Sequence, residues 1–214
     1  MVLKLISSIV DNINVHYYGD FIDEKTADYF FELAEKNMVY NSAEESKVFI
    51  FGKYYKIPRK QVAYGEKGIT YKFSGNVVST IDWNNENDEI CKYLRYFRDK
   101  IKRITGEEYN FVLINRYKDG YDNIGSHADD EKDLGKNPNI VGISFGEERN
   151  IIFHSKKKPQ LLTQENIALP LKHGSLYIMY HPTNIYWKHS LPKDINAKNP
   201  RISLTYRKMV KNNI

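Results

Sequence analysis

Apolar residues recur at helical spacing in two early stretches of the chain. In residues 23–37 they are Ala27, Phe30, Phe31 and Ala34, and in residues 86–104 they are Ile90, Leu94, Phe97, Ile101 and Ile104. Positions three or four apart fall on one face of an α-helix, so we predict that both stretches are helices that bury a narrow stripe. Asp23 is a typical N-cap residue for the first helix, and Gly106 suits the end of the second.

From residue 106 onward the pattern changes to short apolar runs of the kind that form β-strands. Residues typical of turns separate these runs. The predicted strands are residues 109–117, 140–145, 150–154, 166–171, 175–180, 185–190 and 201–208. Many short strands at regular spacing indicate a β-sandwich or jelly roll, with the two helices packed on one sheet. Residues 47–75 are also strand-like but more polar, and we expect them to form hairpins outside the main sheet order.

Composition narrows the class of protein. A chain of 214 residues with a single cysteine, Cys91, is long enough to fold without disulfides, and we interpret Cys91 as a packing residue of the second helix. The weakly apolar N-terminal run is too short to cross a bilayer. We therefore expect a soluble, intracellular protein without membrane association. Its net charge of +5 has the right sign for binding nucleic acid.

His127, Asp129 and His189 form the most informative set of polar residues. Side chains two positions apart in an extended segment point to the same side, so the HxD pair can share a metal with a histidine on another strand. Two imidazoles and one carboxylate, with the opposite positions open, are typical of non-haem Fe(II) oxygenases. Arg201, twelve residues beyond His189, is placed to hold the far carboxylate of a 2-oxoacid. Taken singly, HxD is common, and His189 would be interpreted as a core histidine.

The wider sequence around these residues resembles a known family. The stretches that carry the resemblance are NFVLINRYKDG, IGSHADDE, ISFG, LPLKHGSLYIMYHPTNIYWKHSLP and PRISLTYRK. Together they are similar to the AlkB family of 2-oxoglutarate- and Fe(II)-dependent dioxygenases, and most similar to its eukaryotic nuclear branch that repairs double-stranded DNA. The resemblance covers roughly residues 46–210 and implies a double-stranded β-helix (jelly roll) with flanking helices and an N-terminal nucleotide-recognition lid.

The resemblance also implies roles for individual residues. His127, Asp129 and His189 would hold the iron, and Arg207 would lie near the aspartate as part of the catalytic set. The positions that match the 2-oxoglutarate pocket are Asn115, Tyr117, Arg201, Ser203, Thr205 and Arg207. Ser203 stands where family members usually carry Asn, and a hydroxyl has less reach than an amide, so we expect weaker cosubstrate binding at most.

On the substrate side, the resemblance implies that the target base is flipped out of the DNA, because a base inside a duplex cannot reach buried iron. Phe51 and Gly52 match an intercalating finger hairpin, although a lone Phe51 would equally suit a buried strand position. Arg59 and Lys60 would grip phosphates. The remaining positions that match DNA or base-pocket contacts are Tyr71, Phe73, Ser74, Glu131, Lys156 and Lys157. Glu131 also lies in a run of charged residues typical of an exposed surface.

The implied activity is direct-reversal DNA repair. Fe(II), 2-oxoglutarate and O2 would oxidise the methyl group of 1-methyladenine or 3-methylcytosine, and formaldehyde would leave. The implied segments are an N-terminal extension with a supporting helix (1–45), the lid with its finger hairpin (46–80) and a helix plus catalytic core (81–214). We expect a monomer that prefers duplex to single-stranded DNA and is nuclear if its source is a eukaryote. The alternatives are an RNA demethylase, a catalytically silent nucleic-acid-binding module and a protein hydroxylase.

Overall fold

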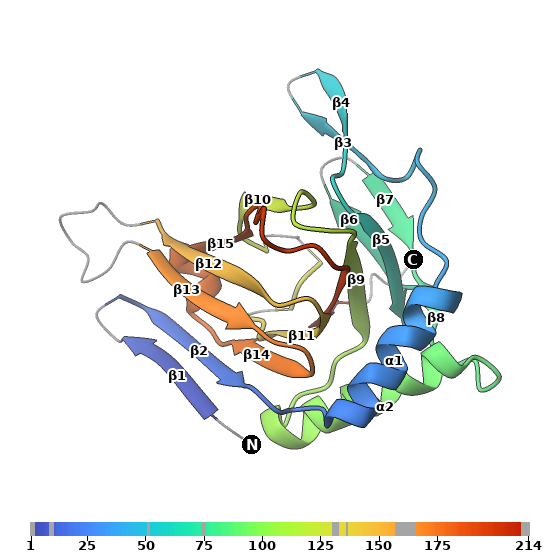
Figure 1. Cartoon of the computed structure of the whole chain (residues 1–214), viewed down its shortest axis with the longest axis horizontal. Helices are drawn as coiled ribbons and strands as arrows, with labels where there is room; N and C mark the ends of the chain where they lie inside the picture. Colours follow the sequence, from blue (N-terminus) through green and yellow to red (C-terminus); the bar gives the residue numbers. More distant parts are fainter. Residues whose placement is uncertain are drawn as a thin grey trace.

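Two antiparallel sheets that face each other form the body of the protein (Figure 1). The structure, a computed structural model, describes residues 3–8, 11–50, 52–73, 76–129, 133–135, 137–156 and 166–210, with the side chains of residues 3, 50, 71–73 and 76–78 left aside. In these parts of the chain, the larger sheet has the strand order β1-β2-β14-β11-β16-β9-β5-β8 and the smaller has the order β10-β15-β12-β13. Their arrangement is the predicted jelly roll.

The larger sheet is antiparallel except for the β5–β8 pair. Its strands, in sequence order, are β1 (Leu3–Ser8), β2 (Ile13–Tyr18), β5 (Lys60–Gly65), β8 (Ile81–Asp82), β9 (Phe111–Tyr117), β11 (Ile140–Gly146), β14 (Ser175–Met179) and β16 (Arg201–Arg207). The smaller sheet consists of β10 (Ile124–His127), β12 (Arg149–Ser155), β13 (Asn166–Leu171) and β15 (Trp187–Leu191). The seven strands predicted beyond residue 106 are all present, with ends that differ by up to two residues.

Two apolar cores lie on opposite sides of the larger sheet. One lies between the two sheets and contains Tyr17, Phe153 and Trp187. The other lies between the larger sheet and the helices α1 (Glu24–Asn37) and α2 (Glu89–Thr105). The larger sheet is therefore buried on both faces across its central strands, as its almost continuous apolar sequences require.

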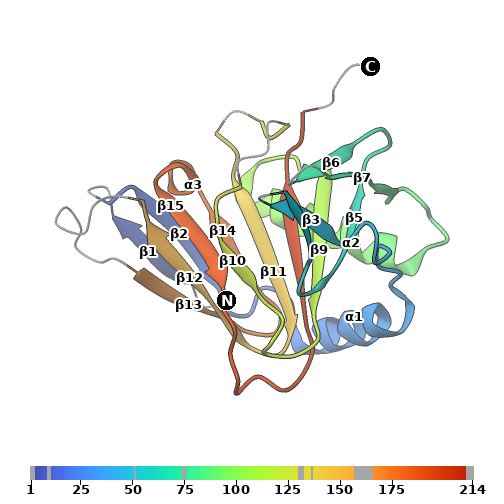
Figure 2. The same cartoon turned by 90° about the horizontal axis from the view of Figure 1, so that it is seen from above.

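Both predicted helices are confirmed, and the residues that bound them act as expected. The side chain of Asp23 accepts a hydrogen bond from the backbone N–H of Thr26 at 2.9 Å, and Gly106 ends α2 with a φ of 73°. The second helix begins at Glu89, three residues later than predicted, because Asp88 is its N-cap. Figure 2 shows both helices at the end of the molecule away from β12 and β13. Within the described residues, no helix is long and apolar enough to span a membrane.

Three sequence predictions need correction. Residues 47–75 were expected to lie outside the main sheet, yet β5 pairs with β9 inside it, and only the hairpins β3–β4 (Lys47–Ile50, Lys53–Lys56) and β6–β7 (Thr70–Phe73, Asn76–Ser79) stand apart. Strands β1 and β2 were not predicted; they extend the sheet beyond β14. Residues 185 and 186 belong to a short helix, α3 (Thr183–Tyr186), and not to the following strand.

Candidate metal centre and active site

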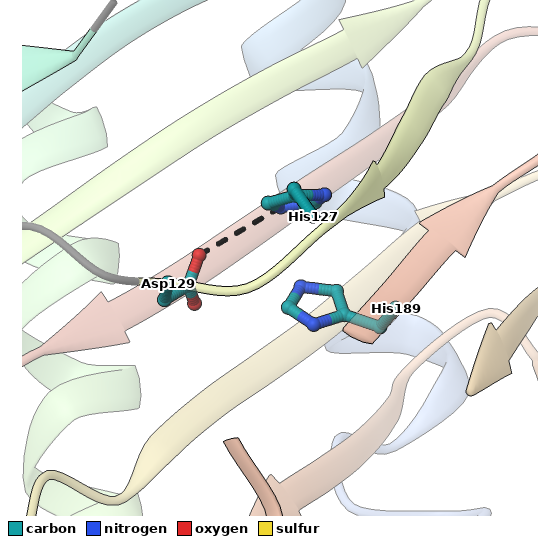
Figure 3. Close-up of side chains that lie close together, drawn as sticks. All are labelled: His127, Asp129 and His189. Atoms are coloured by element: carbon teal, nitrogen blue, oxygen red, sulfur yellow. Dashed lines mark ion pairs between the residues drawn. The ribbon is translucent and has the colours of Figure 1, made fainter. Parts of the chain in front are cut away.

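The two histidines of the candidate metal site are held opposite each other by strand pairing. Strand β10 pairs with β15 so that His127 lies across from His189, and Asp129 follows two residues after β10 ends. One ligand atom from each of the three side chains lies within 4.8 Å of the others, and Figure 3 shows the three groups turned towards a common point. No other such cluster of His, Cys, Asp or Glu side chains occurs in the described part of the chain.

Hydrogen bonds orient the first of these imidazoles. The Nδ1 of His127 lies 2.9 Å from the carbonyl oxygen of Gly125, which can only accept, so Nδ1 carries the proton. The lone pair is then on Nε2, which lies 3.7 Å from Oδ1 of Asp129. A backbone carbonyl that fixes the tautomer of a histidine in this way is a common outer partner of metal ligands.

The Asp129 carboxylate is buried and bound on one side only. Nη2 of Arg207 donates a hydrogen bond of 2.8 Å to Oδ1, and both side chains are almost fully buried. The other oxygen, Oδ2, is buried and has no hydrogen-bond partner among the described residues. Since buried polar atoms are nearly always paired, an unpaired carboxylate oxygen next to two imidazoles indicates a missing cation.

The protonation states of these groups suit metal binding. Burial by itself would raise the pKa of Asp129, but the charge of Arg207 and then the two histidines outweigh it and lower the pKa to about 2. Burial, followed by the His127 ring, lowers the pKa of His189 to about 3. Near neutral pH the aspartate is therefore ionised and His189 is neutral, which are the forms that bind a metal ion.

Strand β16 supplies a row of polar side chains to the space between the sheets. Its apolar residues, Ile202, Leu204 and Tyr206, belong to the core under the helices. Side chains alternate along a strand, so the intervening residues face the smaller sheet, on the side of the metal cluster. These are Arg201, Ser203, Thr205 and Arg207, all of them buried. Arg201 and Arg207 therefore lie on the same face of β16.

Arg201 is a buried cation without an acidic partner in the described residues. Its Nη2 donates to Oγ of Ser144 at 2.7 Å, and its guanidinium carbon lies 5.3 Å from the centre of the Tyr117 ring. Among the described residues its Nε has no hydrogen-bond partner, and the side chain is 2% exposed. A buried charge is costly unless an opposite charge accompanies it, so this pocket favours an anionic ligand such as a carboxylate.

Asn115 is fixed on β9, the strand beside β16. Its Oδ1 accepts hydrogen bonds from Nε2 of Gln61 at 2.7 Å and from Nε of Arg59 at 2.8 Å. With the amide oxygen occupied by two donors, the amide nitrogen is left to donate to a ligand. Ser203 lies opposite Asn115 in the β9–β16 pairing, so the position that departs from the family pattern is on the wall of the same pocket.

A cavity of about 560 Å³ opens beside the metal cluster, within the size range of ligand sites. His127 and Asp129 line it on one side and Asn184, Ile185 and the lysines Lys156 and Lys188 on the other. Two of the three residues of the metal cluster, His127 and Asp129, therefore border this cavity.

Comparisons with known proteins agree with this geometry. Residues 16–207 match the 2OG-Fe(II) oxygenase superfamily. The chain is 42% identical over 196 residues to the human "DNA oxidative demethylase ALKBH2", covering 90% of this chain and 72% of that protein. The chain belongs to the AlkB family of 2OG-Fe(II) oxygenases. It is also 31% identical over 194 residues to the human "Alpha-ketoglutarate-dependent dioxygenase alkB homolog 3", covering 89% of this chain and 64% of that one.

The fold agrees as well. A solved structure described as "The structure of OsALKBH1" superimposes with a TM-score of 0.56 at 13% identity, covering 97% of this chain and all of that one. At this identity the likeness concerns the fold alone.

The residues present fit the cofactors that this AlkB-family membership implies. Two imidazoles and the open Oδ2 of Asp129 are a donor set for Fe(II). The buried guanidinium of Arg201, which has no acidic partner among the described residues, and the amide nitrogen of Asn115 suit the carboxylates of 2-oxoglutarate.

Several predicted substrate residues are not placed at this site by the structure. Phe51, Ser74, Glu131 and Lys157 lie outside the described residues, as do the side chains of Tyr71 and Phe73. Gly52 follows at the tip of the β3–β4 hairpin with a φ of 77°, a left-handed conformation that favours glycine.

The cationic residues predicted to contact DNA, where the structure describes them, differ in their exposure and in their contacts. Lys60 is exposed, 5.7 Å from the centre of the Tyr40 ring. Arg59 is half-buried, and besides Asn115 it donates to the carbonyl of Asn123 at 3.2 Å. Lys156 donates to two carbonyls of α3. Their roles as DNA contacts stay predictions.

Sequence reasoning missed some residues of the AlkB-type pocket. Ser144 receives the Arg201 hydrogen bond, Gln61 holds Asn115, and Tyr177 is buried against Gly142, where an added Cβ would lie 2.1 Å from the ring. Burial raises the pKa of Tyr177, so its hydroxyl stays protonated. The alternation along β11 could have indicated that Gly142 and Ser144 face the site, because they lie on the other face of the strand from most of its apolar residues. Nothing local marked Gln61.

Proposed function

We propose that this protein removes methyl groups oxidatively from ring nitrogens of DNA bases. The observation that carries the proposal is the His127–Asp129–His189 cluster, in which Asp129 and His189 are buried, together with the buried cation of Arg201 on the strand that also carries Arg207. Relatives at 42% identity that are named DNA oxidative demethylases support DNA as the substrate. In the proposed reaction the methylated base, 2-oxoglutarate and O2 are converted to the unmodified base, formaldehyde, succinate and CO2.

The chain's own residues have defined tasks in this reaction. His127, Asp129 and His189 bind the metal, and Arg207 keeps the aspartate ionised and in one orientation. Arg201, Asn115 and the hydroxyls beside them bind and orient 2-oxoglutarate, and the two sheets exclude water from it. When bound, Fe(II) with 2-oxoglutarate supplies the oxidation of the methyl group, and the protein determines which carbon–hydrogen bond is presented.

The β3–β4 hairpin is the proposed DNA-binding element of the lid expected over residues 46–80, of which β5 belongs to the larger sheet. Figure 1 shows it projecting away from both sheets. It carries exposed aromatic side chains, with Tyr54 at 69% and Phe49 at 50% exposure, and lysines on both strands. Aromatic groups that stack on bases and lysines that contact phosphates are what a finger entering a duplex requires. We propose duplex DNA as the substrate of a monomer, acting in the nucleus of a eukaryotic source.

The test is turnover of 3-methylcytosine in three matched oligonucleotides: duplex DNA, single-stranded DNA and RNA of one sequence. Formaldehyde release is measured with Fe(II) and 2-oxoglutarate present, with Asp129→Ala as the control for metal-dependent turnover. We expect the duplex to be repaired fastest. Faster turnover of RNA would identify an RNA demethylase instead, and no turnover of any substrate would identify a silent binding module.

A further inference from the structure

The backbone of Asp129 is held by a single side chain. Asp129 lies beyond the end of β10, so no strand pairing fixes its peptide groups. Its N–H donates to Oδ1 of Asn184 at 3.1 Å, and its carbonyl accepts from Nδ2 of Asn184 at 2.6 Å. One amide therefore satisfies both backbone groups of the residue, 55 positions away in sequence, much as a neighbouring strand would.

Asn184 is itself fixed, because α3 is anchored to both sheets. On the side of the larger sheet, Thr183 is fully buried; its Oγ1 accepts from the N–H of Asn14 at 2.7 Å and donates to the Asn14 carbonyl at 3.2 Å. On the side of the smaller sheet, Nζ of Lys156 donates to the carbonyls of Asn184 at 3.2 Å and Ile185 at 3.0 Å. A four-residue helix would be unstable alone, and these contacts hold it in place.

We propose that Asn184 is a positioning residue of the metal centre. Arg207 holds one carboxylate oxygen of Asp129, and Asn184 holds the backbone from which the carboxylate extends. Together they leave the side chain one orientation, with Oδ2 available to the ion. Without Asn184 the backbone at Asp129 has more conformational freedom. Metal binding must then remove that freedom, so the affinity for the metal falls.

Asn184 also lines the cavity beside the cluster. The position of α3 thus affects both the metal ligand and the wall that a substrate meets. This inference rests on the proposed assignment of Asp129 as a metal ligand, and it assigns Asn184 no contact with the ion or the substrate.

The experiment compares Co(II) binding to the metal-free full chain and to three variants: Asn184→Ala, Asn184→Asp and Asn84→Ala. Asn84 is the matched control, because its Nδ2 also donates a hydrogen bond, to Asp82, but on an exposed turn outside the site. The dissociation constant is measured by titration, the coordination geometry by the visible spectrum of Co(II), and folding by the melting temperature without metal.

We expect Asn184→Ala to weaken Co(II) binding by about tenfold or more and to alter the Co(II) spectrum, because outer partners of metal ligands commonly contribute this much. Asn184→Asp keeps the acceptor for the Asp129 N–H and should lose less. Asn84→Ala should match the wild type. Wild-type affinity and spectrum in Asn184→Ala would overturn the inference, as would a lower melting temperature with an unchanged spectrum. If the wild-type chain itself bound no Co(II), the metal site of the proposed function would fail instead.

Discussion

At the scale of single residues, the candidate metal centre depends on a buried charge, that of Asp129, which is paired with Arg207. Asp129 is ionised because Arg207 lies beside it, and His189 is neutral because it is buried. The sequence was sufficient to find these residues, since His127, Asp129, His189 and Arg207 stand in a recognisable pattern. It did not show the side chains that hold Asp129 and Asn115, because Asn184 and Gln61 reach these two residues only through the fold.

His189 makes the stability of the metal-free protein depend on pH. Its pKa is lowered from 6.5 to about 3 in the folded state, so between these values the unfolded chain binds more protons. Its contribution is complete above pH 6.5 and is lost as the pH falls towards 3, at up to about 1.4 kcal/mol per pH unit.

Urea unfolding of the metal-free protein at pH 7.5 and pH 5 measures this effect. His189→Gln should lose less stability over the same interval than the wild type. Equal losses in both proteins would show that His189 is not a buried neutral group.

At the scale of elements, helices were the easiest to predict and short strands the hardest. The apolar stripe of α2 and the residues that bound this helix, Asp88 and Gly106, can be recognised in the local sequence. Cys91 is a buried residue of the same helix, as expected. Strand β5 was misplaced because its pairing with β9 is a tertiary contact that polar neighbours conceal. Strand β2 was missed although its buried residues Ile13, Val15 and Tyr17 alternate with Asn14 and His16, and β1 is defined by its pairing with β2 at the edge of the sheet.

The turn after β11 constrains Gly146 more tightly than most glycines in the chain. Its φ is 82°, and an added Cβ would lie 2.4 Å from the Pro200 carbonyl oxygen and 2.6 Å from the Phe31 ring. We expect Gly146→Ala to reduce the free energy of unfolding by about 2–4 kcal/mol, from backbone strain and overpacking together. Gly19→Ala, whose Cβ would have no neighbour closer than 3.8 Å, is the control in the same urea titration. Similar stabilities of the two variants would contradict this account of the turn.

The β3–β4 hairpin should contribute more to duplex repair than to single-strand repair. Phe51 is the residue proposed to insert between bases as a wedge. A base must be unstacked from a duplex before it is flipped, whereas a base in a single strand does not need the wedge. We expect Phe51→Ala to lower kcat/KM on duplex DNA by about tenfold or more, the loss of roughly 1–3 kcal/mol of stacking, with a smaller effect on single strands.

Tyr96→Ala is the control, because Tyr96 is an exposed aromatic residue of α2, outside the hairpin. Equal losses on duplex and single-stranded substrates in Phe51→Ala, or equal behaviour of both variants, would remove the wedge.

At the scale of the whole molecule, the jelly roll brings distant polar residues into one space between two sheets. The sequence predicted this architecture from strand spacing and family resemblance, and the fold and the family are both confirmed. What it could not give is the pairing of the strands, which places β15 next to β10 in the smaller sheet and β16 next to β9 in the larger one. Such pairing depends on contacts between residues far apart in the chain.

Metal and cosubstrate should stabilise these strands as a unit, since the residues proposed to bind them come from β9, β10, β15 and β16 and from Asp129 just after β10. At about a hundred times the dissociation constant, a ligand that binds only the folded state adds about 2.7 kcal/mol. For a chain of 214 residues that is a rise in melting temperature of about 5–10 °C. The measurement uses Mn(II) with an unreactive 2-oxoglutarate analogue, and EDTA should reverse it. In Arg201→Gln, only the part of the rise in melting temperature that comes from the metal should remain. If ligands left the melting temperature of the wild type unchanged, a site shared by metal and cosubstrate would be contradicted.

The most direct test of the metal-centred account is the stoichiometry of products from 3-methylcytosine in duplex DNA. With Fe(II), 2-oxoglutarate and O2, the wild-type protein should release formaldehyde and succinate in equal amounts. Asp129→Ala, which removes the buried carboxylate between His127 and His189, should release neither. Formaldehyde release by Asp129→Ala at the wild-type rate would contradict the account.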